Sequence, residues 1–360
     1  MTQTWYRELV RQSLTDRILD EKTCMDLLVA EGIDLLLLMQ AAFTVREKTF
    51  GRTVSIHILN NVKNGRCPED CNYCAQSSKS DAPIETYATK DDDEILEEAS
   101  QAYLSGAHRY CMVYAGQGAS DKRISRLVHI IRAIKEKFPL EVCVSTGIVT
   151  EQQAVALKEA GLDRLNHNLN TAPSRYATIC TTHGFSDRVA TLEAARRAGL
   201  SVCSGIIAGM GETPEEIVAL GRLLRSFEVH SIPVNFLLPV PGIQTGTPQG
   251  LSPAYCLKIL ALFRFLNPTA DIRAAAGREY HLRSLEHLCL YPANSIFMDG
   301  YLNTHGASRK KTLQMIKDSG FTLQSNLSVD ELLQQEQGIL DDESGRVYIK
   351  NKKTLRPALL

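Results

Sequence analysis

The hydrophobic and polar positions of the chain follow two alternating patterns from residue 53 onward. Short segments with apolar side chains at every second position, such as Val54, Ile56 and Ile58 within residues 53–59, predict β-strands. Longer segments with apolar residues three and four positions apart, such as residues 122–138, predict amphipathic helices. Because the strands alternate with helices, the pattern indicates a parallel sheet with helical crossovers.

Repeated strand–helix units fill the chain between residues 53 and 320. The predicted strands are residues 53–59, 108–113, 140–145, 164–168, 201–207, 232–240, 271–275 and 295–299. Their number and the total length match a single α/β fold of the (β/α)8 TIM-barrel type. A doubly wound open sheet is the alternative arrangement of the same elements.

The two ends of the chain are predicted to be additions to this barrel. Residues 1–50 predict an N-terminal helical cap, and residues 51–320 form the barrel itself. Residues 321–360 predict a short C-terminal extension with a helix over 328–337, a polar stretch over 341–345 and a strand over 347–349. The basic residues of the tail are expected to form a solvated end: Lys350, Lys352, Lys353 and Arg356.

Charge and cysteine content narrow the class of protein. A net charge of −1 gives no basic patch for nucleic acid. The longest apolar run, residues 33–39, is too short to cross a membrane, and residues 1–22 lack the apolar segment of a secretion signal. Ten cysteines without such a signal favour the cytoplasm, where clustered thiols are more often metal ligands or catalysts than disulfides.

Three of these cysteines lie in the loop directly after the first predicted strand. Cys67, Cys71 and Cys74 have the spacing C-x3-C-x2-C. A structural zinc ion and a 4Fe–4S cluster normally take four protein ligands, so three thiolates leave one position open to a small molecule. We therefore expect an open 4Fe–4S cluster on the face where barrel active sites lie. A zinc site or a redox-active thiol group is the alternative.

Three further cysteines fall inside predicted strands. If the side chains of Cys111, Cys143 and Cys203 point inward, they converge on the barrel axis and could hold a second, smaller iron–sulfur cluster. Arg273, in the seventh strand, is the candidate for a fourth position, although it could also pair with a carboxylate. Each cysteine taken alone is more typical of a packed core than of a ligand, but three on separate inner strands make the two interpretations about equal. The remaining cysteines are expected to be structural: Cys24, Cys180, Cys256 and Cys289.

Polar side chains also gather at the predicted strand ends. Asn166, His167, Asn168 and Asn170 leave the fourth strand together and offer the paired donors and acceptors that bind hydroxyls, amides or ureas. An asparagine-rich turn is the alternative. Asn235 lies in an apolar stretch of the sixth strand, so it needs a ligand or the backbone as its partner.

The segment GRCPEDCNYCAQSS resembles the cluster loop of the biotin synthase family, within the radical S-adenosylmethionine (SAM) superfamily. Further segments resemble that family in the same order, over roughly residues 30–320: RYCMVYAG, EVCVSTG, LNHNLNTAPSRY, SVCSGIIAGMGET, IPVNFLLPVPG, IRAAAGRE and ANSIFMDGYLNT. The resemblance implies a complete barrel that forms a homodimer. It also implies sulfur insertion into dethiobiotin to form biotin, the last step of biotin biosynthesis, with electrons from a donor such as flavodoxin or ferredoxin.

The resemblance assigns roles to the residues singled out above. It implies that Cys67, Cys71 and Cys74 bind a 4Fe–4S cluster whose open iron holds SAM, the source of a 5′-deoxyadenosyl radical that abstracts hydrogen. It implies a 2Fe–2S cluster, the sulfur source, on the second set of ligands: Cys111, Cys143, Cys203 and Arg273.

The same resemblance predicts the contacts to the small molecules. Tyr73 matches a position beside the adenine of SAM, Asn168 and Asn170 match positions at the ribose, and Arg188 matches the partner of the SAM carboxylate. The residues expected around the ureido ring of dethiobiotin are Asn166, Asn168 and Asn235. Asn170 departs from the family pattern, which usually has Asp there, and the loop residue His183 departs as well.

Two other functions remain open at this point. A radical SAM barrel of similar layout, such as a hydrogenase-maturation or methylornithine-synthase type of enzyme, would share the first cysteine set. A non-catalytic iron–sulfur carrier would need an accessible cluster and no substrate pocket. The second ligand set and the asparagines favour the biotin synthase prediction over the other radical SAM enzymes and over the iron–sulfur carrier.

Overall fold

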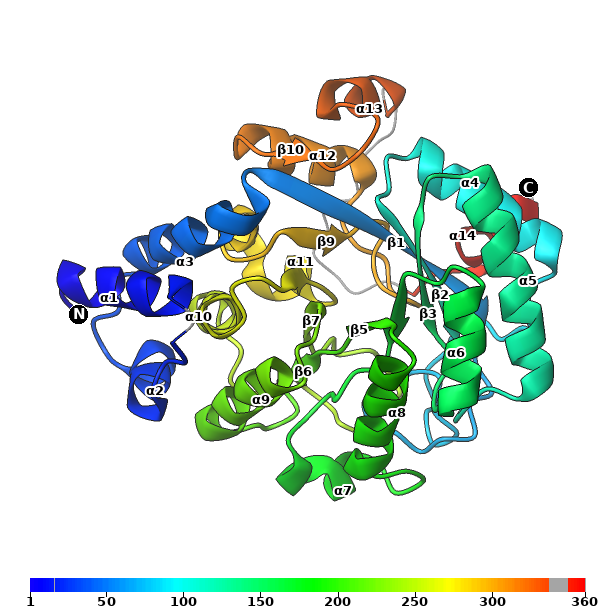
Figure 1. Cartoon of the computed structure of the whole chain (residues 1–360), viewed down its shortest axis with the longest axis horizontal. Helices are drawn as coiled ribbons and strands as arrows, with labels where there is room; N and C mark the ends of the chain where they lie inside the picture. The colour runs from blue at the N-terminus through cyan, green and yellow to red at the C-terminus, as the bar shows by residue number, and fades with distance from the viewer. Residues whose placement is uncertain (16, 337–348, 360) are drawn as a thin grey trace.

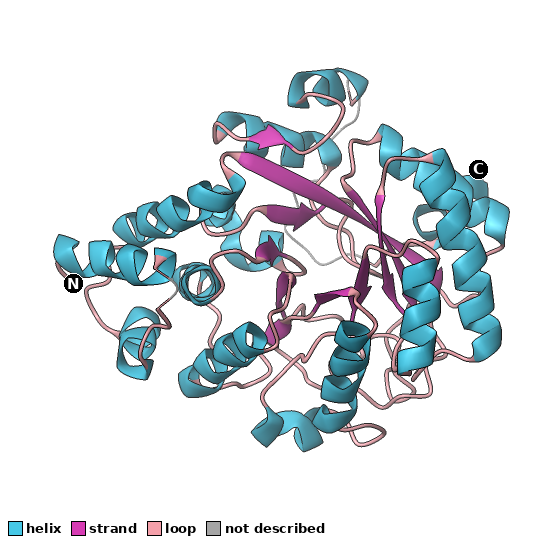
Figure 2. Ribbon diagram, viewed as in Figure 1, coloured by secondary structure: helices cyan, strands magenta, loops and turns pink. Residues whose placement is uncertain are grey.

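The centre of the molecule is a closed parallel β-barrel (Figures 1 and 2). The computed structural model describes residues 1–15, 17–336 and 349–359. Neighbouring strands pair in parallel, and β9 returns to β1 and closes the ring, which confirms the TIM-type barrel and excludes the open sheet. The strands of the ring are β1 (Thr53–Lys63), β2 (Arg109–Tyr114), β3 (Glu141–Ser145), β4 (Arg164–Asn166), β5 (Ser201–Cys203), β7 (Ser231–Phe236), β8 (Asp271–Ala274) and β9 (Ser295–Phe297).

Helices surround this ring on the outside (Figure 2). They are α4 (Asp92–Leu104), α5 (Asp121–Lys137), α6 (Glu151–Glu159), α7 (Tyr176–Ile179), α8 (Phe185–Arg197), α9 (Pro214–Ser226), α10 (Pro253–Leu266), α11 (Arg278–Leu282) and α12 (Arg309–Asp318). Helix α6 begins with a capping box between Thr150 and Gln153. The buried face of α5 consists of Ile124, Leu127, Ile130, Ile131 and Ile134, as the helical period predicts.

The fifth position of the ring differs from the prediction. The expected strand over 201–207 is broken into β5 and β6 (Ile206–Ala208), with Ser204 and Gly205 between them. A Cβ atom at Gly205 would lie 1.9 Å from the carbonyl oxygen of Pro233, so only glycine allows the chain to pass β7 this closely. Other strand ends differ as well: β1 runs on to Lys63, whereas β4, β7 and β9 end earlier than predicted, at Asn166, Phe236 and Phe297. Helix α11 is followed by a 3-10 segment, Arg283–Leu290.

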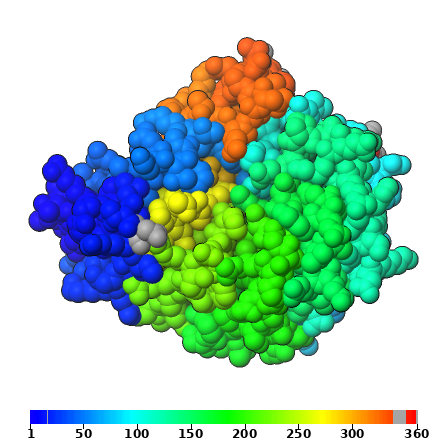
Figure 3. Space-filling view, viewed as in Figure 1, coloured from blue at the N-terminus to red at the C-terminus, as the bar shows by residue number. Residues whose placement is uncertain are grey.

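The N-terminal helices pack against one side of the barrel, beside α10 (Figures 1 and 3). They are α1 (Gln3–Leu14), α2 (Glu21–Val29) and α3 (Leu35–Phe50). Arg46 on α3 is buried and donates to the carbonyl oxygens of Ala293 at 3.0 Å and Thr53 at 2.8 Å, which ties the cap to the ends of two strands. Within the described ranges, no helix has the length and apolar character needed to cross a membrane.

The C-terminal segment is docked on the barrel, contrary to the expected solvated end. Strand β10 (Thr322–Leu323) extends the sheet beside the start of β1, and α13 (Val329–Gln335) covers α12. The predicted features over 341–345 and 347–348 lie outside the described residues. Beyond them, the backbone of Lys350 donates to Asn303 at 2.7 Å, and Arg356 forms an ion pair with Glu94. Lys352 and Lys353 are exposed, as expected.

Candidate functional site

One cavity of about 270 Å³ lies at the carboxyl ends of the barrel strands. Its walls contain the cysteine loop after β1, the polar residues after β4, Arg188 of α8 and Asn235 of β7. The loop after β9, residues 301–304, forms part of the rim. The barrel therefore brings together, around one space, residues that lie far apart in the sequence.

The cysteine loop presents three thiols to this cavity. Cys67, Cys71 and Cys74 are free thiols, and a hydrogen bond from the amide of Cys74 to the carbonyl of Cys71 at 3.2 Å closes a tight turn between them. Burial raises the pKa of Cys67 and raises that of Cys74 to about 11. Such thiols lose their protons when a metal binds, because the metal compensates the charge of the thiolate. Three convergent sulfur donors beside open space suit a cluster with one free iron.

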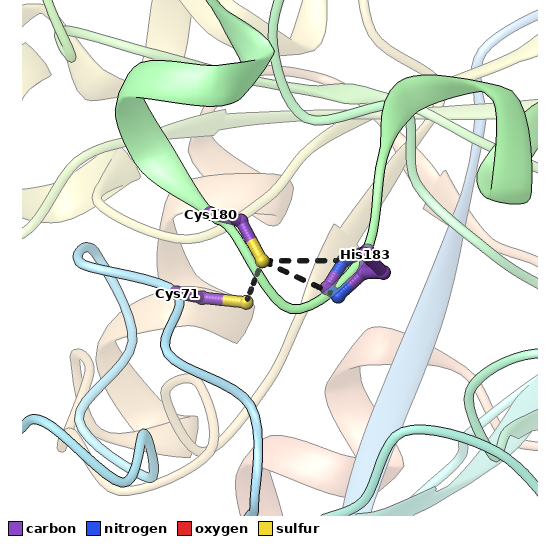
Figure 4. A group of neighbouring side chains, drawn as sticks. All are labelled: Cys71, Cys180 and His183. Atoms are coloured by element: carbon purple, nitrogen blue, oxygen red, sulfur yellow. Dashed lines mark hydrogen bonds between the residues drawn. The ribbon is translucent and has the colours of Figure 1, made fainter.

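A further cysteine reaches this group from another loop (Figure 4). Cys180, directly after α7, places its sulfur 3.6 Å from the sulfur of Cys71 and 3.3 Å from Nδ1 of His183. Nδ1 of His183 also contacts the carboxylate of Glu69. From the sequence, Cys180 is expected to be structural, and this expectation does not include the contact with Cys71. The spacing Cys180-x2-His183 was the available signal, but the contact with Cys71 arises only from the folded arrangement.

The expected SAM contacts lie next to the cysteine loop. The side-chain amide of Asn170 donates to the hydroxyl of Tyr73 at 2.6 Å, and Asn170 has a left-handed φ of 67°. Burial raises the pKa of Tyr73 well above its usual value, so its hydroxyl stays protonated. Arg188 donates to the carbonyl of Asn168 at 2.9 Å and also contacts the hydroxyl of Tyr176. A cation and several amides thus surround the space beside the thiols.

The asparagines connect this space with the barrel interior. The amide of Asn166 donates to Oδ1 of Asn168 and to the sulfur of Cys203, both at 3.2 Å. Asn235 uses the backbone as its partner: its amide donates to the carbonyl of Ile206 at 2.9 Å, and its oxygen accepts from the amide of Ala276 at 3.2 Å. Asn235 still lines the cavity, so the same fixed side chain can also face a ligand.

The three strand cysteines converge deeper in the barrel. Cys111 and Cys143 lie opposite one another on β2 and β3, and Cys203 on β5 lies opposite Asn166 on β4. All three thiols are buried. The nearby thiol of Cys111 raises the pKa of Cys143, whereas that of Cys203 acts in the opposite direction. Three neighbouring thiols in a closed interior have the donor chemistry of a small iron–sulfur cluster.

Arg273 lies beside the three strand cysteines. It forms an ion pair with a carboxylate, which was the alternative to its being a cluster ligand. Its guanidinium is 3.9 Å from the sulfur of Cys203, 2.8 Å from the hydroxyl of Ser231 and 3.3 Å from Asp271. Its Nε has no hydrogen-bond partner among the described residues. Arg273 therefore faces the thiols with one side and is anchored by the other.

Asp271 is the residue that sequence reasoning missed at this depth. Its carboxylate accepts from Arg109 at 3.2 Å and from Arg164 at 2.9 Å as well as from Arg273. Burial alone would raise the pKa of Asp271, but the surrounding cations hold it well below its usual range. The carboxylate is thus ionised and forms ion pairs with all three arginines in the barrel interior. Its position at the start of a buried strand was the only signal in the sequence.

Comparison with known families matches two parts of the chain. The profile described as "Radical SAM superfamily" matches residues 62–224, and the one described as "Biotin and Thiamin Synthesis associated domain" matches residues 233–322. A protein named biotin synthase from Magnetococcus marinus is 56% identical over 313 residues, which are 87% of this chain and 98% of that relative. A biotin synthase from Acaryochloris marina is 49% identical over 330 residues, covering 91% and 95%.

Solved structures with the same architecture are more distant. The hydrogenase maturase HydG from Carboxydothermus hydrogenoformans gives a TM-score of 0.75 at 19% identity and covers 90% of this chain and 80% of its own. Methylornithine synthase (PylB) gives a TM-score of 0.75 at 20% identity, covering 87% and 96%. At this identity the likeness shows the fold alone.

Proposed function

The chain belongs to the biotin synthase family of the radical SAM superfamily, and we infer from this that it converts dethiobiotin to biotin by inserting sulfur. The observation that carries the inference is the presence of two thiol groups at two depths of one barrel. Asn166 connects them, since its amide lies 3.2 Å from the sulfur of Cys203 while it lines the cavity that Cys67, Cys71 and Cys74 also line. A substrate in that cavity therefore lies between the outer thiols and Asn166, whose amide contacts the deep group.

We assign the outer group to the 4Fe–4S cluster with SAM and the deep group to the 2Fe–2S cluster. The outer ligands are Cys67, Cys71 and Cys74, and the deep ligands are Cys111, Cys143, Cys203 and Arg273. When bound, these groups supply one-electron cleavage of SAM, hydrogen abstraction by the 5′-deoxyadenosyl radical, and a sulfur atom from the 2Fe–2S cluster. The chain supplies the binding, the orientation and the exclusion of water.

The SAM contacts follow from the groups around the outer thiols. Arg188 carries the positive charge for the SAM carboxylate, and its bond to the carbonyl of Asn168 fixes the guanidinium at the cavity wall. Asn168 and Asn170 offer amides to the ribose hydroxyls. The bond from Asn170 orients the ring of Tyr73, which we place beside the adenine.

The dethiobiotin contacts follow from the asparagines between the two thiol groups. A ureido ring has one carbonyl acceptor and two N–H donors, which asparagine amides match. We assign Asn166, Asn168 and Asn235 to this ring. Asn235 is buried and held by two backbone hydrogen bonds, so it presents its amide in a fixed orientation. Fixed donors reduce the cost of ordering the bound complex.

We also propose the organisation of the protein in the cell. The chain divides into a cap over 1–50, a barrel over 51–320 and an extension over 321–360, forms a homodimer and receives electrons from a flavodoxin or ferredoxin. All ten cysteines are free thiols, which supports a reducing cytoplasmic location. Light scattering of the purified protein tests the dimer, and electron transfer from each reduced donor tests the partner.

The test of the proposed function is an anaerobic conversion assay. Protein reconstituted with iron and sulfide is mixed with SAM, dethiobiotin and a reductant, and biotin and 5′-deoxyadenosine are quantified by mass spectrometry. We expect both products, and neither with Cys71→Ala. If 5′-deoxyadenosine forms without biotin, the chain is a radical SAM enzyme for another substrate. If neither forms although both clusters are present, the proposal is wrong.

A further inference from the structure

Cys71, Cys180 and His183 bring three metal-binding atoms close together in the described part of the chain (Figure 4). The two sulfurs are 3.6 Å apart, and the sulfur of Cys180 is 3.3 Å from Nδ1 of His183. All three ligand atoms lie within 4.8 Å of one another. Both cysteines are buried, and neither forms a disulfide.

These separations suit ligands of a single tetrahedral ion. Metal–sulfur bonds of about 2.3 Å and metal–nitrogen bonds of about 2.0 Å place two sulfurs about 3.8 Å apart, and a sulfur and a nitrogen about 3.5 Å apart. A disulfide would need the sulfurs at about 2.05 Å. The observed distances therefore lie close to those that one bound ion would require.

Glu69 can supply the fourth ligand. Its side chain is buried, and its Oε2 contacts Nδ1 of His183 and accepts from the hydroxyl of Thr182 at 2.7 Å. An ion between Nδ1 and Oε2 would replace that direct contact with two metal–ligand bonds. Asp70 also approaches, with Oδ1 3.3 Å from the sulfur of Cys180, but its oxygens already accept hydrogen bonds from Thr181 and Thr182.

The surroundings balance the charge of such a site. Two thiolates and one carboxylate around a divalent ion leave one negative charge, which the nearby guanidinium of Arg188 offsets. In the ion-free structure Arg188 donates to Nε2 of His183 at 2.9 Å, so binding of the ion requires Arg188 to release Nε2. With Nδ1 on the metal, the imidazole carries its proton on Nε2. The hydroxyl of Tyr176, 3.0 Å from Nε2, can accept that proton in a hydrogen bond. Metal-bound histidines normally have such a partner on the second nitrogen.

We propose that the cluster-free protein binds one divalent transition-metal ion, Fe²⁺ or Zn²⁺, through Cys71, Cys180, His183 and Glu69. Each thiol releases one proton to solvent when the ion binds, and no electron is transferred. Because Cys71 serves both sites, the single ion and the 4Fe–4S cluster exclude one another. This exclusion rests on the proposed assignment of Cys71 to the cluster, whereas the binding itself does not.

The test uses Co²⁺ as a spectroscopic probe on the full chain, freed of clusters by anaerobic chelation. We expect the visible bands of a tetrahedral ion and near-ultraviolet thiolate charge transfer. Cys180→Ala should reduce the Co²⁺ bound by one ion per chain, whereas Cys67→Ala, the matched control in the cluster loop, should bind as much as wild type. Both variants keep the three strand cysteines, so any Co²⁺ bound there contributes equally to both and does not affect the difference between them. Circular dichroism establishes that each variant is folded.

With these two variants, either of two outcomes would overturn the proposal. Undiminished Co²⁺ binding by Cys180→Ala would show that Cys180 is not a ligand. An equal loss in Cys67→Ala would mean that the ion uses the cluster cysteines instead. If Cys180→Ala does not fold, His183→Gln is used in its place. Its affinity for Co²⁺ should fall at least about tenfold because a nitrogen ligand is removed, and unchanged affinity would contradict the proposal.

A separate measurement tests the exclusion between the ion and the cluster. Protein that carries the 4Fe–4S cluster should take up one Co²⁺ fewer than cluster-free protein, and equal uptake would count against the cluster assignment of Cys71 alone.

Discussion

Asp271 and Arg273 lie two residues apart on β8, and the carboxylate of the first contacts the guanidinium of the second at 3.3 Å. Side chains two residues apart on a strand share one face, so both point into the barrel. The same carboxylate oxygen also accepts from Arg109 and Arg164. Asp271 therefore fixes the orientation of Arg273 beside the deep thiols and neutralises part of the positive charge gathered there.

Removing the charge of Asp271 should destabilise the barrel. Asp271→Asn preserves the shape of the side chain but leaves three arginines without their shared counter-ion, and breaking a buried pair of this kind costs about 3 kcal/mol. Urea unfolding of the cluster-free protein measures the free energy of unfolding. The control is Asp26→Asn, which removes an exposed ion pair with Lys22 and should leave stability unchanged. Equal stability of Asp271→Asn and wild type would contradict this account of the network.

The contribution of Asp271 should also depend on pH in a defined direction. Its folded-state pKa lies well below the usual value, so its ionised form stabilises the fold at every pH above the pKa of the unfolded chain, about 3.9. The difference in stability between wild type and Asp271→Asn should be constant from about pH 5 to 8 and should shrink as the pH falls below about 4. Unfolding curves at a series of pH values give this difference. A difference that grew in acid would show the opposite sign of the pKa shift.

Asn170→Asp should strengthen SAM binding. A carboxylate forms stronger hydrogen bonds to ribose hydroxyls than an amide, and a gain of about 1 kcal/mol corresponds to about fivefold in Kd. Aspartate also tolerates the left-handed backbone of this position. The protonated hydroxyl of Tyr73 can turn from acceptor to donor, so the contact is kept. Equilibrium binding of SAM to the reconstituted protein measures the effect, and Asn170→Ala should bind more weakly than wild type. Weaker binding by Asn170→Asp would remove Asn170 from the proposed ribose contacts.

Arg356→Ala should release the docked C-terminal segment. Arg356 pairs with Glu94, stacks over the ring of Tyr87 and lies next to Leu355, whose carbonyl accepts from Lys90 at 2.6 Å. Without these contacts the segment should become a faster substrate for chymotrypsin, which does not recognise the changed residue. Lys353→Ala, at an exposed position of the same segment, is the control and should be cut at the wild-type rate. Equal rates for both variants would mean that Arg356 does not hold the segment.

The order and type of the barrel elements could be predicted from the sequence because they depend on local periodicity. The break at Gly205 could not, since it reflects the approach of the Pro233 carbonyl on another strand.

The site shows the same division between local and long-range information. The spacing of Cys67, Cys71 and Cys74 is local and could be recognised. The contact of Cys180 with Cys71 could not be predicted, because the two residues lie 109 positions apart in the sequence. Only the fold brings their sulfurs to within 3.6 Å of one another. The docking of Lys350 on the rim was also missed, because a basic tail gives no local signal for burial.

The most direct test of the central claim is the pair of products made by Cys143→Ala. The claim is that the deep thiols hold the sulfur source and that the outer thiols alone support SAM cleavage. Cys256→Ala, which changes a buried cysteine of α10, is the matched control and should make both products. In the anaerobic assay, Cys143→Ala should form 5′-deoxyadenosine but no biotin, and iron analysis should show only the 4Fe–4S cluster. Biotin formation by Cys143→Ala at the wild-type level would contradict the account.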